Sequence, residues 1–269
     1  MENHLDKHDD FFYDSPLAAR LYDLQHAGDP ALDAEYRLLL DLMRRAGGPI
    51  LELGCGTGRI LLPALANGMD ICGMDRSGAF LARLVEKARA MHIDARPRVW
   101  RADLQRPGAG PRRFALAFAA FRTFDHLVER DARRRFLIAA RYFIRPGGRL
   151  ILNLINPDPH VLAHADTQLS LVRDDLRDPI SRRRVQWWSA SRIDRRTHRI
   201  TETSQYQFMD SRGRIVDECR YYIAVRWTPR REMESLARRT AWRIEHCWGG
   251  FHREPYADGS GDAVWVLRR

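Results

Sequence analysis

The sequence predicts an α/β fold, with a parallel sheet, helices on both faces and an inserted antiparallel β meander. Two observations lead to this prediction. Between residues 33 and 154, apolar runs of strand length alternate with helical patterns, as in the βαβ units that build a parallel sheet. After Pro159 the pattern changes to long stretches of alternating polar and apolar residues, which indicate antiparallel strands with one solvated face.

The parallel sheet is expected to contain five strands. They are predicted at Pro49–Leu53, Met69–Met74, Arg96–Arg101, Phe114–Phe118 and Arg149–Leu154. Four helices are predicted between and before them, at Asp33–Ala46, Arg59–Ala66, Gly78–Met91 and Glu129–Phe143. Glycines follow most of these helices, as at Gly68 and Gly147-Gly148, and they predict a stop before the next strand.

Three long strands form the expected meander, and a helix and two strands follow it. The meander strands are predicted at Arg184–Ile193, Arg199–Met209 and Ile215–Trp227. The helix at Pro229–Arg239 and strands at Trp242–Cys247 and Ala263–Leu267 are expected to rejoin the parallel sheet. This divides the chain into a helical cover (1–36), a binding core (37–156), a β cover insert (157–228) and a segment completing the core sheet (229–269).

The net charge of +10 raises the question of a nucleic-acid partner. Arginines cluster at 133–135 and 182–184, but the only lysines are Lys7 and Lys87, so a GC-rich coding bias accounts for the excess. The clusters also lack the interleaved aromatic residues of a base-stacking surface. Nucleic acid is therefore not the expected partner.

Other features of composition favour an ordinary cytoplasmic protein. The first ten residues are polar and acidic, and no apolar run reaches the length of a membrane span, so neither a targeting signal nor a membrane contact is expected. Cys55, Cys72, Cys219 and Cys247 form no CxxC pair, and we expect free thiols and no metal site. A homodimer is left open.

A glycine loop after the first strand predicts a ligand site. The segment reads Ile50-Leu51-Glu52-Leu53-Gly54-Cys55-Gly56-Thr57-Gly58, and its glycines allow a sharp turn and close approach of a ligand. The dinucleotide fingerprint requires a glycine where Arg59 stands. A carboxylate is unfavourable beside a pyrophosphate, whereas the methionyl ammonium of S-adenosylmethionine (SAM) tolerates or uses one. Glu52 therefore favours SAM.

Two further acids follow the next two strands. Asp75 is placed to accept hydrogen bonds from both ribose hydroxyls, while Ser77 is the better cap for the following helix. Asp103 can accept from the exocyclic amine of adenine, with the apolar Leu104 packed on the ring. Acids at three consecutive strand ends converge on the crevice where open α/β sheets bind ligands.

These residues resemble the class I SAM-dependent methyltransferases, which have a Rossmann-like sheet. A closer resemblance, over nearly the whole chain, is to a bacterial group similar to the TDP-amino-sugar N,N-dimethyltransferases. It rests on the meander and on segments 22–24, 33–36, 121–127, 156–158, 248–251 and 255–256, among them Phe121-Arg122-Thr123-Phe124-Asp125-His126-Leu127 and Trp248-Gly249-Gly250-Phe251. In those enzymes the meander covers the cleft and helps to shape the acceptor site.

From the residues and this resemblance we expect thirteen cofactor-binding residues. They are Tyr22, Tyr36, Glu52, Gly54, Cys55, Gly56, Gly58, Asp75, Arg76, Ala102, Asp103, Leu104 and Phe118. Tyr22 and Tyr36 suit a cationic methyl donor, although both would also serve as helical core residues. The chain departs from the group at Arg76, where an apolar residue is usual, and at Gly250, where the loss of an acid would remove an acceptor contact.

Two residues after the fourth strand are the catalytic candidates. His126 resembles the histidine found at this place in some amino-sugar dimethyltransferases and could act as a general base, with an ordinary pKa near ~6.5. The alternative is a loop histidine that bonds a backbone carbonyl. Arg122 could hold an anionic group of the acceptor, or pair with Asp125.

The sequence thus predicts SAM-dependent methylation of a small molecule, most simply at an amine or a hydroxyl of a sugar or natural product. A nucleic-acid methyltransferase is the alternative enzyme, but Phe118-Ala119-Ala120-Phe121 lacks the Asn/Asp-Pro-Pro-aromatic signature of enzymes that methylate base amino groups. A SAM-binding protein without catalytic activity is a third reading, because fold does not fix function.

Overall fold

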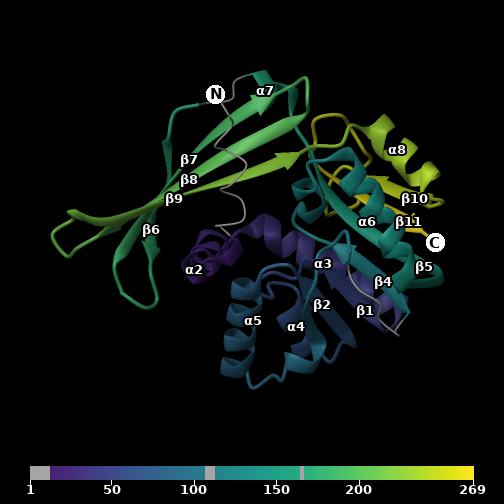
Figure 1. Cartoon of the computed structure of the whole chain (residues 1–269), viewed down its shortest axis with the longest axis horizontal. Coiled ribbons are helices and arrows are strands. Elements are labelled where there is room, and N and C mark those ends of the chain that lie inside the picture. Colours follow the sequence, from purple (N-terminus) through teal and green to yellow (C-terminus); the bar gives the residue numbers. More distant parts are fainter. Residues whose placement is uncertain (1–12, 107–112, 164–166) are drawn as a thin grey trace.

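The computed structural model describes residues 13–106, 113–163 and 167–269. Their strands form two sheets, one of seven strands and one of four (Figure 1). The first twelve residues of the expected cover at 1–36 lie outside the described residues. None of the helices in the described ranges is long and apolar enough to cross a membrane.

The seven-stranded sheet has the order β10-β11-β5-β4-β1-β2-β3. Its strands are β1 (Ile50–Leu53), β2 (Ile71–Asp75), β3 (Val99–Arg101), β4 (Phe114–Ala119), β5 (Ile144–Asn156), β10 (Arg243–Trp248) and β11 (Gly261–Arg268). The first five run parallel, and β11 pairs antiparallel with both β5 and β10. Because β1 lies between β2 and β4, the strand order reverses there, which creates the crevice where such sheets bind ligands.

Helices cover both faces of this sheet, as predicted. On one face lie α3 (Pro30–Ala46), α4 (Leu61–Ala66) and α5 (Gly78–Ala90), whose Met43, Leu62 and Leu84 pack on the strands. On the other face lie α6 (Arg130–Phe143) and α8 (Arg230–Arg239), represented by Phe136 and Met233. The strands between them are apolar on both sides, since β4 is buried along its whole length.

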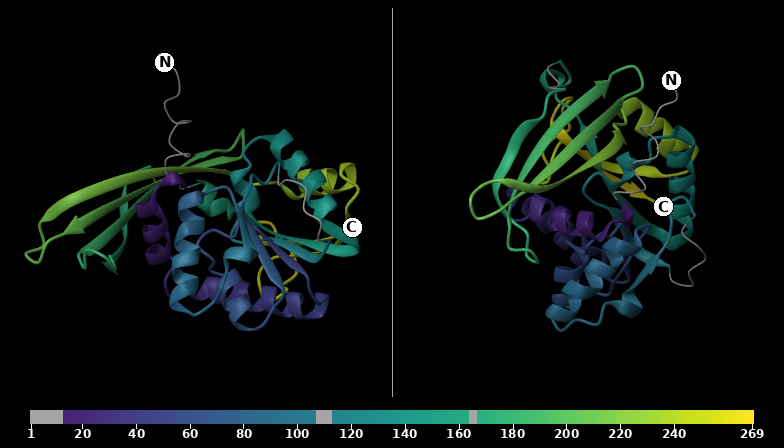
Figure 2. Two further views of the ribbon diagram at one scale, coloured as in Figure 1. Left: turned by 60° about the horizontal axis from the view of Figure 1, so that its bottom comes forward. Right: turned by 60° about the vertical axis from the view of Figure 1, so that its left-hand side comes forward.

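The four-stranded sheet is the predicted meander with one additional strand. It contains β6 (Ser170–Arg177), β7 (Arg184–Asp194), β8 (Arg199–Met209) and β9 (Ile215–Arg226), all antiparallel. Its inner face packs on α2 (Pro16–Gln25) through a third apolar cluster that includes Leu21, Tyr206 and Phe208. Figure 2 shows it as a separate layer that extends beyond the core.

Several elements differ from the prediction for local reasons. Residues Arg96–Arg98 form a 3-10 turn, because Pro97 cannot donate to a strand ladder, and β3 is correspondingly short. Gly147-Gly148 do not stop α6 but lie within the longer β5, where they exchange backbone hydrogen bonds with Arg269. The edge strand β6 was missed because most of its residues are exposed, so that it has little apolar alternation.

Three short helices at the edges of the core had no predicted bounds, although the first of them lies in the expected helical cover. These are α2, α7 (Pro159–Ala163) and the 3-10 turn η3 (Thr123–His126). Ser15 caps α2 by accepting from the Ala18 N–H, and Pro16 occupies the first turn, a pattern that the sequence does contain. The helix α3 runs unbroken across the boundary that we placed between residues 36 and 37.

Candidate active site

A cavity of about 450 Å³ lies where the carboxyl ends of β1 to β4 face the inner side of the four-stranded sheet. Tyr22 and His26 come from α2 and its end, and the loops after β1, β2, β3 and β4 supply the opposite wall. Glu202 of β8 and Ile223 and Val225 of β9 close it from the cover. The crevice predicted from the three strand ends is therefore a bounded cavity.

Glu52 lies at this end of β1 and is 3% exposed. Burial raises the pKa of its carboxyl well above the ordinary value, and the nearby charges of Glu35 and Asp75 add to this, while Arg59 opposes it. Its Oε2 is buried and has no hydrogen-bond partner among the described residues. A buried acceptor without a partner is costly, so this oxygen is suited to a donor that a ligand brings.

The glycine loop after β1 is held by the next acid along the sheet. Asp75 ends β2 and accepts hydrogen bonds from the backbone N–H groups of Gly56 and Ser77, both at 2.8 Å. Burial raises its pKa. Ser77 caps α5 through the Phe80 N–H, as expected. Gly54 turns sharply at φ +81°, and a Cβ there would lie 2.5 Å from Cγ2 of Thr123. The loop thus requires a glycine at this point.

Most of the expected cofactor residues reach the cavity wall. In addition to Glu52, Gly54 and Asp75, they are Tyr22, Cys55, Gly56, Arg76, Asp103 and Leu104. Burial raises the pKa of the Tyr22 hydroxyl to about 12, so it stays protonated. The Arg76 guanidinium lies 4.4 Å from the centre of the Tyr13 ring, so this departure from the group places a cation against an aromatic face.

Four expected cofactor residues do not line the cavity. Phe118 is 0% exposed and packs with the core under α3, α4 and α5, because side chains alternate along β4. Tyr36 packs against the same cluster, and its hydroxyl accepts from Asn67. The adjoining Gly58 is enclosed by Leu62 and Leu84. Ala102 packs on the α6 side of the sheet.

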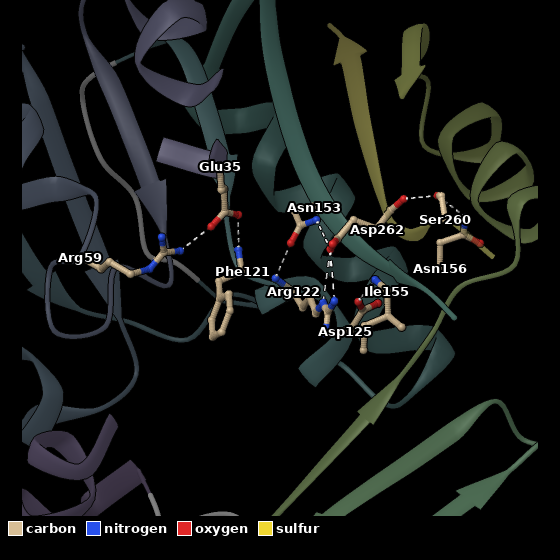
Figure 3. Close-up of polar contacts among 10 residues, drawn as sticks. All are labelled: Glu35, Arg59, Phe121, Arg122, Asp125, Asn153, Ile155, Asn156, Ser260 and Asp262. Carbon is tan, nitrogen blue, oxygen red and sulfur yellow. Dashed lines mark hydrogen bonds and ion pairs between the residues drawn. The ribbon is translucent and has the colours of Figure 1, made fainter. Parts of the chain in front are cut away.

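The loop after β4 has two consecutive residues in the left-handed conformation, Phe121 at φ 48° and Arg122 at φ 61°. Such a backbone costs roughly 1 to 3 kcal/mol for each residue and needs support from its surroundings. The Phe121 N–H donates to Glu35 Oε1 at 2.7 Å, and the Arg122 N–H donates to Asn153 Oδ1 at 3.1 Å (Figure 3). Side chains of α3 and β5 therefore fix the path of this loop.

Arg122 lines the cavity but does not pair with Asp125. Its Nε and an Nη both lie 3.4 Å from Oδ1 of Asp262 on β11, and Asn153 donates to the same oxygen (Figure 3). Asp125 is completely buried and instead accepts from the Ile155 N–H at 2.6 Å. Burial raises its pKa to about 7, with Arg133 acting in the opposite sense. It is a structural residue of the loop.

His126 lies on the cavity wall, where its Nδ1 is 3.0 Å from the hydroxyl of Tyr13. The imidazole ring is exposed to the space inside the cavity. The walls of the cavity nevertheless surround the ring with protein, which disfavours its charged form. Desolvation by the surrounding protein, followed by the charge of Arg76, lowers the pKa of His126 to about 4. The ordinary pKa expected from the sequence is therefore wrong, because the sequence does not show that Arg76 and the surrounding protein lie near this ring. The imidazole is neutral throughout the physiological range.

Comparison with known proteins agrees with this architecture. Residues 50–148 match the methyltransferase domain family. The CcbJ methyltransferase of Streptomyces caelestis is 22% identical, with a TM-score of 0.70 over 90% of this chain and 97% of that chain. Streptomyces venezuelae DesVI is 20% identical, with a TM-score of 0.71 over 93% and 97%. No curated protein sequence matches the chain.

A third similar structure is CalS10 from Micromonospora echinaspora, an amino pentose methyltransferase with SAM bound. It is 19% identical, with a TM-score of 0.66 over 94% of this chain and 96% of that chain. The fold is that of a class I SAM-dependent methyltransferase. The resemblance predicted from the sequence is confirmed, and SAM is the cofactor that the family match and the SAM-bound neighbours support.

The cavity of this methyltransferase fold suits SAM by the chemistry of its side chains. The unpartnered Oε2 of Glu52 is an acceptor for an ammonium group, and the Asp75 carboxylate retains lone pairs beyond its two backbone contacts. Asp103 and Leu104 offer an acceptor and an apolar surface at the end of β3. The segment around Gly250 does not line the cavity, so an acid missing there removes no contact from its wall.

Several residues of the methyltransferase cavity were not predicted. Tyr13, His26, Arg59 and Glu202 line it, while Glu35 supports it from α3. Glu35 is next to the predicted Tyr36, so the helix was placed correctly but its rotation was not. The sequence did contain a signal for Glu202. In the alternating stretch Arg199–Met209 it is the one charged residue at the positions that share a face with Tyr206 and Phe208.

Proposed function

We propose that this protein transfers a methyl group from SAM to an amine, or to a hydroxyl, of a small molecule such as a sugar or natural product. One arrangement carries the proposal. The acids Glu52 and Asp75, suited to SAM, and the neutral His126 paired with Tyr13 line one cavity under the β cover. The sugar methyltransferases among the structural neighbours support the class of acceptor.

The roles of the residues follow from their chemistry. Asp75 would accept from the ribose hydroxyls, Asp103 from the adenine amine, and Glu52 from the methionyl ammonium, directly or through water. When bound, SAM would supply an electrophilic methyl carbon. A lone pair of the acceptor would form the new bond to that carbon, and the electron pair of the broken sulfur–methyl bond would remain on sulfur. Such a displacement depends mainly on alignment.

His126 would orient the acceptor. Because its imidazole is neutral, one ring nitrogen can accept a hydrogen bond from an acceptor N–H or O–H and take the proton that the reaction releases. The hydrogen bond from Tyr13 to Nδ1 leaves Nε2 protonated, whereas the reverse hydrogen bond leaves Nε2 as the acceptor. The second arrangement is the one that supports catalysis.

The test has two stages, both with the full chain. Calorimetry with SAM and with its demethylated product in the presence of EDTA measures cofactor binding, and we expect saturable binding without a metal. Release of the demethylated product is then measured with a panel of amino sugars and their hydroxyl counterparts. Binding without turnover on any acceptor would contradict the enzymatic proposal and favour a SAM-binding protein. Absence of SAM binding would contradict the proposal altogether.

A further inference from the structure

The carboxylate of Glu202 enters the cavity from the cover sheet, on the opposite side from Glu52 and Asp75. It lies on the inner face of β8, where its cross-strand partners are Ser191 of β7 and Ile223 of β9. Its Oε1 accepts from the hydroxyl of Ser189 at 3.5 Å. Among the described residues Glu202 has no ion-pair partner within 4 Å. The carboxylate is thus placed among small serine side chains and the apolar side chain of Ile223.

Burial makes the charge of Glu202 costly, and the cavity compensates for it only in part. Burial raises the pKa of Glu202, while the hydroxyl of Ser189 and the charge of Arg122 lower it. Arg122 is already engaged by Asp262. A carboxylate in such surroundings is stabilised when a cation enters the same space.

The sign of the cavity supports a cationic occupant. Among the described residues, five carboxyl groups and three guanidinium groups line it, and the carboxyl groups remain the more numerous even without Glu52, whose burial favours the neutral acid. The chain as a whole, by contrast, carries a net charge of +10. The two histidines on the wall, His26 and His126, have pKa values lowered to about 4 and add no positive charge at neutral pH. Carboxylates offset part of the positive charge, since Arg59 pairs with Glu35 and Arg122 with Asp262. The lining attracts cations while the outer surface repels them.

We infer that Glu202 is the specificity-determining residue of this cavity, and that it binds the acceptor amine in its protonated form, whose nitrogen becomes a nucleophile only after it has released that proton to solvent. Ile223 and Val225 lie on the same face and would contact the apolar part of such a molecule. The inference rests on the proposed function, because it assigns the acceptor end of the same site. Glu202 would distinguish amines from neutral alcohols of equal size, since only a protonated amine carries a positive charge that can pair with the Glu202 carboxylate.

A pair of probes that differ only in charge tests this. Cyclohexylamine, protonated at pH 7, and cyclohexanol are titrated into the full-length protein, with and without saturating demethylated SAM, and both dissociation constants are measured by ligand-observed NMR. We expect the wild type to prefer the ammonium by about ten- to hundredfold, the range for a hydrogen bond to a charged group. Glu202→Gln should reduce this preference to about twofold or less.

Matched variants separate a local effect from a general one. Glu218→Gln removes an exposed carboxylate from the outer face of the same sheet and should leave the preference unchanged. Glu202→Asp keeps the charge and should retain part of the preference. This variant keeps the inference testable if Glu202→Gln does not fold. Equal affinity of the wild type for the two probes would overturn the inference, and so would a preference that survives in Glu202→Gln. The probes are also titrated without cofactor, so the preference due to Glu202 can be measured even if the protein does not bind SAM. Failure to bind SAM would therefore contradict the proposed function and not this inference.

Discussion

The hydroxyl of Tyr13 lies 3.0 Å from Nδ1 of His126, joining the segment before α2 to the loop after β4. The two rings meet edge to face with centroids 5.9 Å apart, and the Arg76 guanidinium lies over the Tyr13 ring, 4.4 Å from its centre. One nitrogen of the imidazole is therefore occupied, which leaves Nε2 for exchange with an acceptor.

We expect His126→Ala to reduce the rate of methylation by about a hundred- to ten-thousand-fold, the usual contribution of a general base. The affinity for SAM should stay nearly unchanged, because the assigned cofactor contacts lie with Glu52, Asp75 and Asp103. Turnover and calorimetry are measured on the same preparation. Tyr13→Phe removes the hydroxyl but keeps the ring, and should cause a smaller loss. Turnover of the alanine variant within a few-fold of wild type would make His126 structural.

The dependence of the rate on pH should reflect the lowered pKa of His126. An imidazole with a pKa of about 4 is already neutral at pH 6. Protonation of His126 should therefore lower kcat/KM only as the pH falls toward 4. Arg76→Gln removes the second cause of the shift, and its acidic limb should move to higher pH. The profiles are measured from pH 4 to 8 with one acceptor. A wild-type inflection near pH ~6.5 that disappears in His126→Ala would contradict the lowered value.

Asp75→Ala should weaken SAM binding by roughly 1.5 to 3 kcal/mol, the range for hydrogen bonds to a charged group. The substitution also frees the Gly56 N–H, so part of the loss comes from the glycine loop. Asp70→Ala is the matched control, because Asp70 lies at the other end of β2 and pairs with Arg98. Calorimetry decides the outcome. Equal losses in the two variants would remove Asp75 from the ribose site.

Glu35→Ala should destabilise the fold by about 3 to 5 kcal/mol, since it breaks a buried ion pair and frees a backbone N–H. Glu35 is 2% exposed, lies 2.5 Å from Arg59 and accepts from Phe121. Glu86→Ala removes an exposed partner of Arg83 and should cost at most ~1 kcal/mol. Chemical denaturation measures both free energies of unfolding. A loss below that of the control would show that the loop after β4 does not depend on Glu35.

The basic surface should not act as a nucleic-acid site. Gel-shift titration with RNA and DNA at physiological salt is expected to show only weak association, because non-specific binding falls in the range of about 10⁻⁴ to 10⁻⁶ M. The acidic lining of the cavity gives a second reason, since phosphate groups would be repelled from it. Sub-micromolar binding that weakens steeply with salt would make a nucleic-acid acceptor the better proposal.

By itself, the sequence determined the two sheets, the helices on both faces, and the acids at the ends of β1, β2 and β3. Each of these leaves a local trace, because burial imposes a period of two on strands and of 3.6 on helices, and a sharp turn requires glycine. The Ser77 cap and the Gly54 turn were accessible for the same reason.

Only the tertiary structure decided how side chains from distant segments meet. Arg122 pairs with Asp262, which is 140 residues away, and not with the neighbouring Asp125. Glu35 faces the loop after β4 while Tyr36 does not reach the cavity, because neighbouring side chains of a helix point about 100° apart and packing decides which of them faces the loop. The pKa of His126 depends on the protein packed around it and on Arg76. Partner choice and burial are properties of the folded chain, since they depend on which remote groups share one low-dielectric space.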